Sequence, residues 1–185
     1  MRDHIAASAL RLFHEDGFDA ISMRKIAKEA DLTPMTIYRY FDGKIDILSK
    51  IWIEIFAELF DELEAHAKAE KNSEQRLRKA ALGYVNYWLE NREHYFLVFM
   101  SKGIKQTDVQ SFIEHKETLQ RFDFFTQCLD EISTPKLGEA TLKLKSELLI
   151  CTLNGIAQNL ITVSSYPWST PEELIDQAIG GIIAC

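Results

Sequence analysis

Hydroxyl, guanidinium and thioether side chains gather between residues 33 and 44, where signals for starting and ending a helix stand close together. Thr33 can cap the free N–H groups of a helix start, and Pro34 suits the first helical position because it has no N–H to satisfy. Gly43 can take the left-handed conformation that ends a helix. The segment therefore predicts a short, two-turn helix between Thr33 and Gly43.

The side chains of this short helix divide into two groups. Ile37 and Phe41 fall on one apolar face, which can pack on a neighbouring helix. The others point away from that face: Met35, Thr36, Arg39 and Tyr40. A rigid helix that shows such groups to solvent is suited to enter the major groove of DNA, where they can read base edges.

Two earlier helices can position this element. Ser22 is a candidate N-cap for a helix over about 22–30, in which Ile26, Ala27 and Ala30 form an apolar stripe. A first amphipathic helix ends at Gly17. Two short helices joined by a turn of three or four residues form the helix-turn-helix pattern, whose second helix lies in the groove.

This arrangement resembles the N-terminal domain of the tetracycline-repressor (TetR) family over about residues 4–50. The resemblance lies in the apolar spacing, a glycine, a Thr-Ile-Tyr-x-Tyr-Phe segment and a trailing lysine, found here in Gly17-Phe18, Ile21-Ser22-Met23-Arg24, Ile26-Ala27, Leu32-Thr33, Thr36-Ile37-Tyr38, Tyr40-Phe41 and Lys44. Asp31 and Met35 depart from the pattern, since many members have glycine at the first position and a small residue at the second. Aspartate tolerates a left-handed turn better than most residues, so we expect the turn to be kept.

Ten residues are candidates for contacts with DNA, and the resemblance implies the roles of some of them. Arg24 matches a position that in relatives reaches a guanine, where a guanidinium can bond O6 and N7 together; a phosphate contact or a solvated side chain is the alternative. Tyr38 and Lys44 resemble phosphate clamps, which fix the register without reading sequence. The other candidates contact bases or phosphates: Ser22, Lys25, Thr33, Met35, Thr36, Arg39 and Tyr40.

The net charge of −7 does not exclude a nucleic-acid partner. Residues 1–50 hold eight Lys or Arg and eight Asp or Glu, so the whole excess of negative charge lies in 51–185. At physiological salt the screening length is roughly 8 Å, so distant acidic residues have little effect on DNA. Within 22–44 the balance is five basic against three acidic residues, which favours DNA binding.

Beyond residue 44 the chain reads as one helix after another. A double apolar stripe at i, i+4 predicts a long helix over about 45–68, and Ser73 can cap the next one. Further helices are expected near 93–101, over 109–132, and over 135–164 and 171–184, the last two opened by Pro135 and Pro171. We predict an all-α fold, with a helix-turn-helix DNA-binding domain over 1–46 and a helical effector-binding and dimerisation domain over 47–185.

The last two helices are expected to carry a homodimer interface. From Leu148 to Val163 apolar residues occupy nearly the whole circumference, and such a helix must be covered on all sides. Paired recognition helices on a palindromic operator need a two-fold dimer, although a central helix inside a monomer is the alternative. The expected interface residues are Leu149, Leu153, Ile156, Leu160, Leu174, Ile175, Ala178, Ile179 and Ile182.

The resemblance also implies a cavity for a small effector among the middle helices. Mostly apolar pockets are typical ligand sites, so we expect an apolar or aromatic compound that lowers DNA affinity. The aromatic candidates can equally be plain core: Trp52, Phe56, Phe60, Tyr84, Trp88, Phe96, Phe99, Phe122 and Phe125. Asn154 and Gln158 can orient a ligand or bond across the dimer seam.

Other function classes have weaker support. Two clusters of Glu and His, around His94 and His115, match neither HExxH nor a carboxylate-histidine bundle signature, so we expect no enzyme, metal or cofactor. A metal-responsive regulator, and a redox-responsive one that uses Cys128 or Cys151, are the alternatives. Both cysteines stand in apolar surroundings that raise a thiol pKa.

The composition is that of a soluble protein. The three cysteines are widely spaced, so we expect them to be reduced. No signal peptide opens the chain, and the longest apolar stretch is too short and too polar for a membrane span. We therefore expect a cytoplasmic protein that does not bind membranes.

Overall fold

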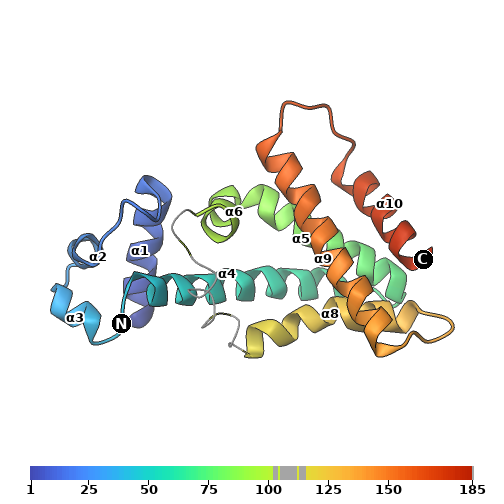
Figure 1. The fold of residues 1–185 in the computed structure, drawn as a ribbon, viewed down its shortest axis with the longest axis horizontal. Coiled ribbons are helices and arrows are strands. Elements are labelled where there is room, and N and C mark those ends of the chain that lie inside the picture. The colour runs from blue at the N-terminus through green and yellow to red at the C-terminus, as the bar shows by residue number, and fades with distance from the viewer. Residues whose placement is uncertain (102–103, 105–111, 113–115, 185) are drawn as a thin grey trace. The chain divides into compact units, whose positions relative to one another are not determined.

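The computed structural model describes residues 1–101, 104, 112 and 116–184, and all regular structure within them is α-helical (Figure 1). The predicted all-α fold class is confirmed. The helices in chain order are α1 (Arg2–Asp16), α2 (Met23–Glu29), α3 (Pro34–Tyr38), α4 (Lys44–Ala67), α5 (Ser73–Glu90), α6 (Arg92–Phe99), α8 (Lys116–Ile132), α9 (Glu139–Thr162) and α10 (Pro171–Ala184).

The chain forms two compact units. The first comprises Met1–Ala57 and Glu93–Thr118, and the second comprises Glu58–Arg92 and Leu119–Cys185. The division of α4 between the units follows packing, whereas the domain boundary after residue 46 that we expect from the sequence is a functional one and stays a prediction.

The first unit is built on α1, α2 and α3. Helix α1 ends at Gly17, as predicted: this glycine has φ 76°, and its N–H donates to the carbonyl of Phe13 at 3.0 Å. Apolar side chains of the three helices and of the adjoining loops are at most 6% exposed and form a shared core: Ile5, Ala9, Leu12, Phe13, Phe18, Ile21, Ile26, Ala27, Ile37 and Phe41. Burial of this core fixes how the helices cross.

Helix α4 follows the predicted double stripe. All nine members of that stripe are buried: Ile47, Leu48, Ile51, Trp52, Ile55, Phe56, Leu59, Phe60 and Leu63. At the start of the helix, a carboxylate oxygen of Asp46 accepts from the backbone N–H of Asp42 at 3.1 Å. This acidic residue in the first turn also suits the helix dipole.

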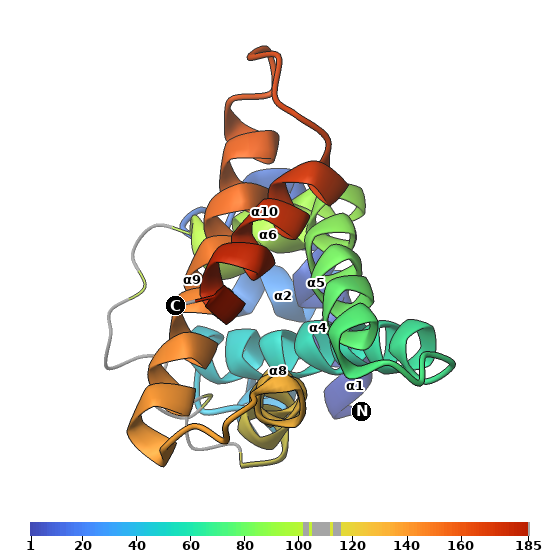
Figure 2. The ribbon, with the colours of Figure 1, turned by 90° about the vertical axis from the view of Figure 1, so that its right-hand side faces the viewer.

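In the second unit, α5, α9 and α10 pack on one another (Figure 2). Each presents a stripe at helical spacing to the shared core, and the buried residues include Leu77, Ala81, Tyr84 and Trp88 of α5, Leu149, Leu153, Ala157 and Ile161 of α9, and Ile175, Ile179 and Ile182 of α10. Helix α5 also approaches α4 closely at Gly83, where a Cβ would lie 2.9 Å from Cδ2 of Leu63.

Several predicted helix ends are wrong. Asn72, and not Ser73, caps α5, because its side chain accepts from the N–H of Gln75 at 2.9 Å. Helix α9 begins at Glu139 and not at Pro135, with Gly138 at its N-cap. Pro171 does open α10, as predicted. The expected start of α8 near Val109 lies outside the described residues.

None of the helices described combines the length and the apolar character that a membrane span requires.

The conformation of Gly17 leads to a stability prediction. Gly17→Ala should lower the free energy of unfolding by about 1–2 kcal/mol, because φ 76° is costly for a residue with a Cβ. Gly43→Ala is the matched control, since Gly43 does not share the positive φ and a Cβ there meets nothing within 4 Å. Urea unfolding should show a change within about 0.5 kcal/mol for the control. Equal losses for both variants would contradict this account.

Candidate nucleic-acid interface

Helix α2 starts at a side-chain cap. The hydroxyl of Ser22 accepts from the backbone N–H of Lys25 at 3.3 Å, which satisfies one of the free donors at the helix start. Ile26 and Ala27 are buried on the inner face, while Arg24, Lys25 and Lys28 are exposed. The short helix therefore presents its basic residues to solvent.

The turn from α2 to α3 depends on one left-handed residue. Asp31 has φ 54°, so the turn that we expected aspartate to tolerate is confirmed. The N–H of Leu32 then donates to the carbonyl of Ala27 at 2.9 Å. These bonds close α2 and direct the chain into α3 within a few residues.

Helix α3 has the predicted start and a different end. The hydroxyl of Thr33 accepts from the N–H of Thr36 at 3.1 Å, and Pro34 occupies the first turn. The regular helix ends at Tyr38, so it is shorter than the predicted two turns. The prediction for Gly43 is wrong, since it lacks a positive φ; the chain ends α3 earlier, through a bond from the N–H of Tyr40 to the carbonyl of Ile37 at 2.9 Å.

Most of the ten predicted DNA contacts lie at the surface of this helical pair. Met35 is 79% exposed and Tyr38 is 55% exposed, which is unusual for large apolar or aromatic side chains. Ser22, Arg24, Lys25, Thr33 and Arg39 are exposed, and Thr36, Tyr40 and Lys44 are half-buried. Ile37 is fully buried and anchors the helix from its inner side.

The cationic residues of this surface divide into two kinds. Arg24 and Arg39 make no ion pair and no side-chain hydrogen bond to the part of the chain that the structure describes. Lys25 pairs instead with Asp16 of α1, at 2.6 Å between Nζ and Oδ2. Like exposed Lys28, the two arginines can therefore contact an external anion without giving up an ion pair to the described residues.

Lys44 has an internal role that sequence reasoning missed. Its Nζ donates to the carbonyl of Phe18 at 2.6 Å and lies 4.0 Å from the centre of the Phe18 ring. Burial lowers the pKa of Lys44, while nearby Asp19 opposes that shift. The lysine therefore fastens the loop after α1 to the start of α4, in addition to any contact with a phosphate.

Arg2 was not among the predicted site residues. Its guanidinium donates to the carbonyl of Tyr40 and lies 4.2 Å from the centre of the Phe41 ring, so it holds the segment that follows α3. It also approaches Asp46 at 3.6 Å. The only sequence signal for this role is an arginine next to an N-terminal helix, which is too common to identify a contact.

The predicted interface residues of α9 and α10 are divided between the inner side and the flanks of these helices. Leu149, Leu153, Ile175, Ile179 and Ile182 are buried within the single chain, and Ile156, Leu160, Leu174 and Ala178 are partly exposed. The outward side of α9 carries a different stripe at i, i+3 and i, i+4 spacing, which we call the outer stripe: Leu144, Leu148, Cys151 and Gly155. Leu144 is 65% exposed and Leu148 is 51% exposed. The all-round apolar character of α9 signalled this second face, but it did not show which face is outward.

The predicted effector residues are divided between the two units. In the first unit, Trp52 and Phe56 are buried, whereas Phe96 and Phe99 are 46% and 39% exposed. In the second unit, the aromatic candidates pack edge to face: the ring centres of Phe60 and Phe122 are 4.8 Å apart, and those of Tyr84 and Phe125 are 6.1 Å apart.

The two polar candidates on α9 behave differently. The hydroxyl of Tyr84 donates to Oδ1 of Asn154 at 2.7 Å, so Asn154 faces α5 within the unit. Gln158 is exposed. Asn154 is therefore occupied within the unit, and a role of either residue toward a ligand stays a prediction.

The alternative readings gain no support from the described residues. No group of three or more His, Cys, Asp or Glu side chains among them can hold a metal ion. Burial raises the pKa of the Cys128 thiol, against the influence of Arg76, as expected. Cys151 is exposed, so the expectation of apolar surroundings is wrong for this cysteine. His115 lies outside the described residues.

Three helices with a common core, a left-handed turn and a capped, exposed third helix define a helix-turn-helix domain. Residues 5–51 match the sequence model of the family described as "Bacterial regulatory proteins, tetR family". The resemblance seen in the sequence is confirmed over this N-terminal part of the chain.

Two relatives show the range of similarity. The transcriptional regulator AcrR of Shigella flexneri is 41% identical over 68 residues, which is 37% of this chain and 31% of that protein. The fatty acid metabolism regulator protein of Bacillus subtilis is 24% identical over 139 residues, or 75% of this chain and 69% of that protein. The match spans 31% to 56% of the length of the first three curated relatives.

Solved structures share the fold over the whole chain. FadR from Bacillus subtilis, crystallised in complex with stearoyl-CoA, superposes with a TM-score of 0.77 at 16% identity and covers 100% of this chain and 98% of its own. At this identity the likeness establishes the fold.

Proposed function

We propose that this chain is a transcriptional regulator that binds a palindromic operator as a dimer, represses by occupying promoter DNA, and releases it on binding a small molecule. The observation that carries the proposal is helix α3, which is capped at Thr33, anchored by buried Ile37 and exposed along its outer side. Exposed Met35 and Arg39 have no use in holding the fold, whereas both can contact DNA. The activity proposed is binding and not catalysis.

The proposed contacts with DNA are of two kinds: those with bases, which read the sequence, and those with phosphates, which position the protein. Arg24 and Arg39 are free to reach DNA, and a guanidinium that bonds guanine O6 and N7 gives ~1–3 kcal/mol of discrimination. Tyr38 and Lys44 supply a phenol and a cation for phosphates, which set the register of the helix on the duplex. Met35 and Thr36 on the first turn can touch thymine methyl groups or base edges.

Substitutions should separate the two kinds of contact. We expect Arg24→Ala to relax the preference at one base pair of each half-site, because it removes a base contact. Lys44→Ala should weaken binding to every sequence alike, through a lost phosphate contact and a loosened Phe18 loop. Fluorescence anisotropy with the operator and its single-base variants, at fixed salt, measures both effects.

Lys68→Ala serves as the charge-matched control, because Lys68 is exposed beyond the end of α4 and should leave DNA affinity unchanged. An equal loss on all sequences for Arg24→Ala and Lys44→Ala would refute the division between reading and positioning.

We infer that the dimer forms through the outer stripe of α9 together with α10. Exposed leucines one turn apart make a patch that water solvates poorly. Gly155 in the stripe, and Gly180 and Gly181 on α10, allow another backbone to approach, since a Cβ at each would meet nothing within 4 Å. A two-fold axis at this seam would pair the stripe with itself.

Leu148→Glu should convert the dimer to a monomer, because it places a charge at the centre of the proposed seam. Sedimentation at micromolar concentration is expected to show a species of twice 21.3 kDa for the parent chain and of one chain for the variant. Gln127→Glu, which adds the same charge to an exposed position of α8, should stay dimeric. A parent chain that sediments only as a monomer would rule out the dimer.

The small molecule is proposed to be apolar or aromatic and to bind in the second unit. Support comes from its aromatic interior with one oriented polar group, Asn154, and from the shared fold with FadR in complex with stearoyl-CoA. Such a ligand can fill space between aromatic rings, while the Tyr84–Asn154 pair offers a donor and an acceptor.

Thermal unfolding tests this part of the proposal. Stearoyl-CoA or another apolar acyl compound should raise Tm, since a ligand at 100 times its Kd adds about 2.7 kcal/mol to the stability of the folded state. Coenzyme A alone is the control for the polar part of the probe and should leave Tm unchanged. A panel of acyl and aromatic compounds without any effect on Tm would contradict the proposal.

A further inference from the structure

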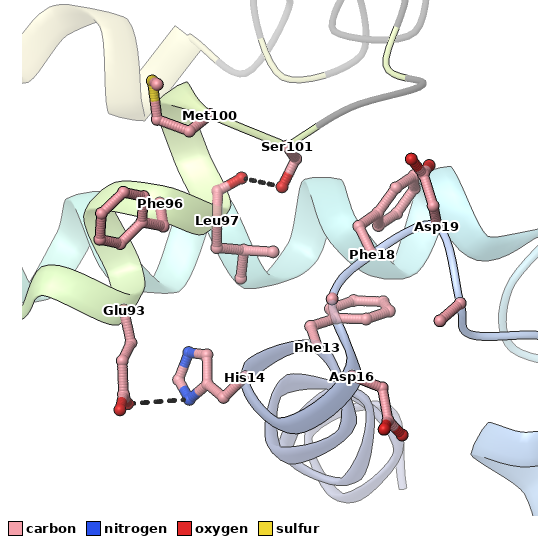
Figure 3. A pocket seen from close by; sticks show the side chains of 12 residues that line it. Phe13, His14, Asp16, Phe18, Asp19, Glu93, Phe96, Leu97, Met100 and Ser101 are labelled. Carbon is pink, nitrogen blue, oxygen red and sulfur yellow. Dashed lines mark hydrogen bonds and ion pairs between the residues drawn. The ribbon is translucent and has the colours of Figure 1, made fainter.

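A cleft in the first unit lies between the end of α1, the loop that follows it and α6 (Figure 3). Its volume is about 440 Å³, which is within the range of small-molecule sites. None of the ten candidate DNA contacts lines it, and Phe96 is the single effector candidate among the described residues that does. The cleft is therefore separate from both sites proposed above.

Aromatic and thioether side chains form the apolar part of the cleft. The rings of Phe13 and Phe18 lie 5.3 Å apart between centres, on the side of α1 and its loop. Phe96 and Met100 of the opposite wall are 46% and 45% exposed, so their apolar surface is available to a ligand. Aromatic faces carry negative potential and attract cations.

Carboxylates form the polar part. Asp16, Asp19 and Glu93 line the cleft, and no Lys or Arg stands among the described residues that line it. Asp16 is neutralised by Lys25 at 2.6 Å, and Asp19 lies near Lys44, whose Nζ is 4.0 Å from the centre of the Phe18 ring. The side chain of Glu93 is 76% exposed and lies 3.4 Å from Nδ1 of His14.

His14 compensates the negative charge of Glu93 poorly. Burial lowers the pKa of His14, against the influence of Glu93, so the imidazole is neutral at pH 7. Its Nε2 is buried and has no hydrogen-bond partner in the described residues. Glu93 therefore keeps a negative charge at the mouth of an aromatic cleft.

We propose that this cleft binds an organic cation with an apolar or aromatic body. The body would lie against the exposed side chains of Phe96 and Met100, and the cationic group would lie beside Glu93. A metal ion is disfavoured, because no suitable set of ligands is present among the described residues. An anion is disfavoured by the carboxylate of Glu93.

Calorimetry on the full chain without DNA tests the proposal, so its outcome is independent of the proposed function. Benzyltrimethylammonium is the probe, because it joins an aromatic ring to a permanent positive charge. Benzyl methyl sulfone, which is neutral, and benzylsulfonate, which is negative, have similar size. We expect one cation to bind per chain at pH 7.5, and neither of the other two compounds to bind measurably.

Two exposed lining residues allow substitutions that the fold should tolerate. Glu93→Gln should raise the Kd for the cation by about fivefold or more, through loss of the charge, and Phe96→Ala by a similar factor, through loss of the ring. Glu90→Gln is the matched control: it removes an exposed carboxylate that lines a separate cleft between α4 and α5. Its Kd should equal that of the parent chain.

The proposal is overturned if the cation does not bind, if the neutral sulfone binds equally well, or if Glu90→Gln and not Glu93→Gln weakens binding. Circular dichroism of each variant confirms that a loss of affinity comes from a folded chain.

Discussion

The placement of α3 depends on a single backbone constraint, the left-handed conformation of Asp31. Between Ala30 and Thr33 the chain ends one helix, reverses and caps the next, and the φ of 54° at Asp31 makes this possible in so few residues. Ile26, Ile37 and Phe41 then bury the inner faces of both helices. The packed core therefore keeps the two helices in the arrangement that the turn establishes. The outer side of α3 is left with side chains that the fold does not need.

Local patterns were sufficient to predict most helices. The i, i+4 stripe of α4 is an apolar signal over six turns, and its bounds are correct to within one residue. Helix ends were less predictable, because several capping residues compete in the same stretch. Asn72 and Ser73 are both good caps, and only the position of the neighbouring N–H of Gln75 decides between them. Gly43 resembles a helix end by type, but α3 had already ended.

The exposed residues of the candidate site were predictable from the sequence, whereas the contacts that hold them in place were less so. Met35 and Thr36 follow from the cap and the outer face of a short helix, whereas the roles of Arg24, Tyr38 and Lys44 come from the resemblance to the family. The contacts of Lys44 with Phe18 and of Arg2 with Tyr40 join segments 26 and 38 residues apart, and no spacing rule reveals such pairs. For α9, periodicity showed two apolar faces without showing which one the remainder of the chain covers.

The glycine at position 83 has a consequence for motion inside the second unit. With a would-be Cβ only 2.9 Å from the methyl carbon of Leu63, the backbone of α5 packs directly against a side chain of α4, and α5 contributes no side chain of its own at that point. When two helices are in such contact, a displacement of one is passed on to the other. A ligand that displaces α5 would therefore also displace the end of α4.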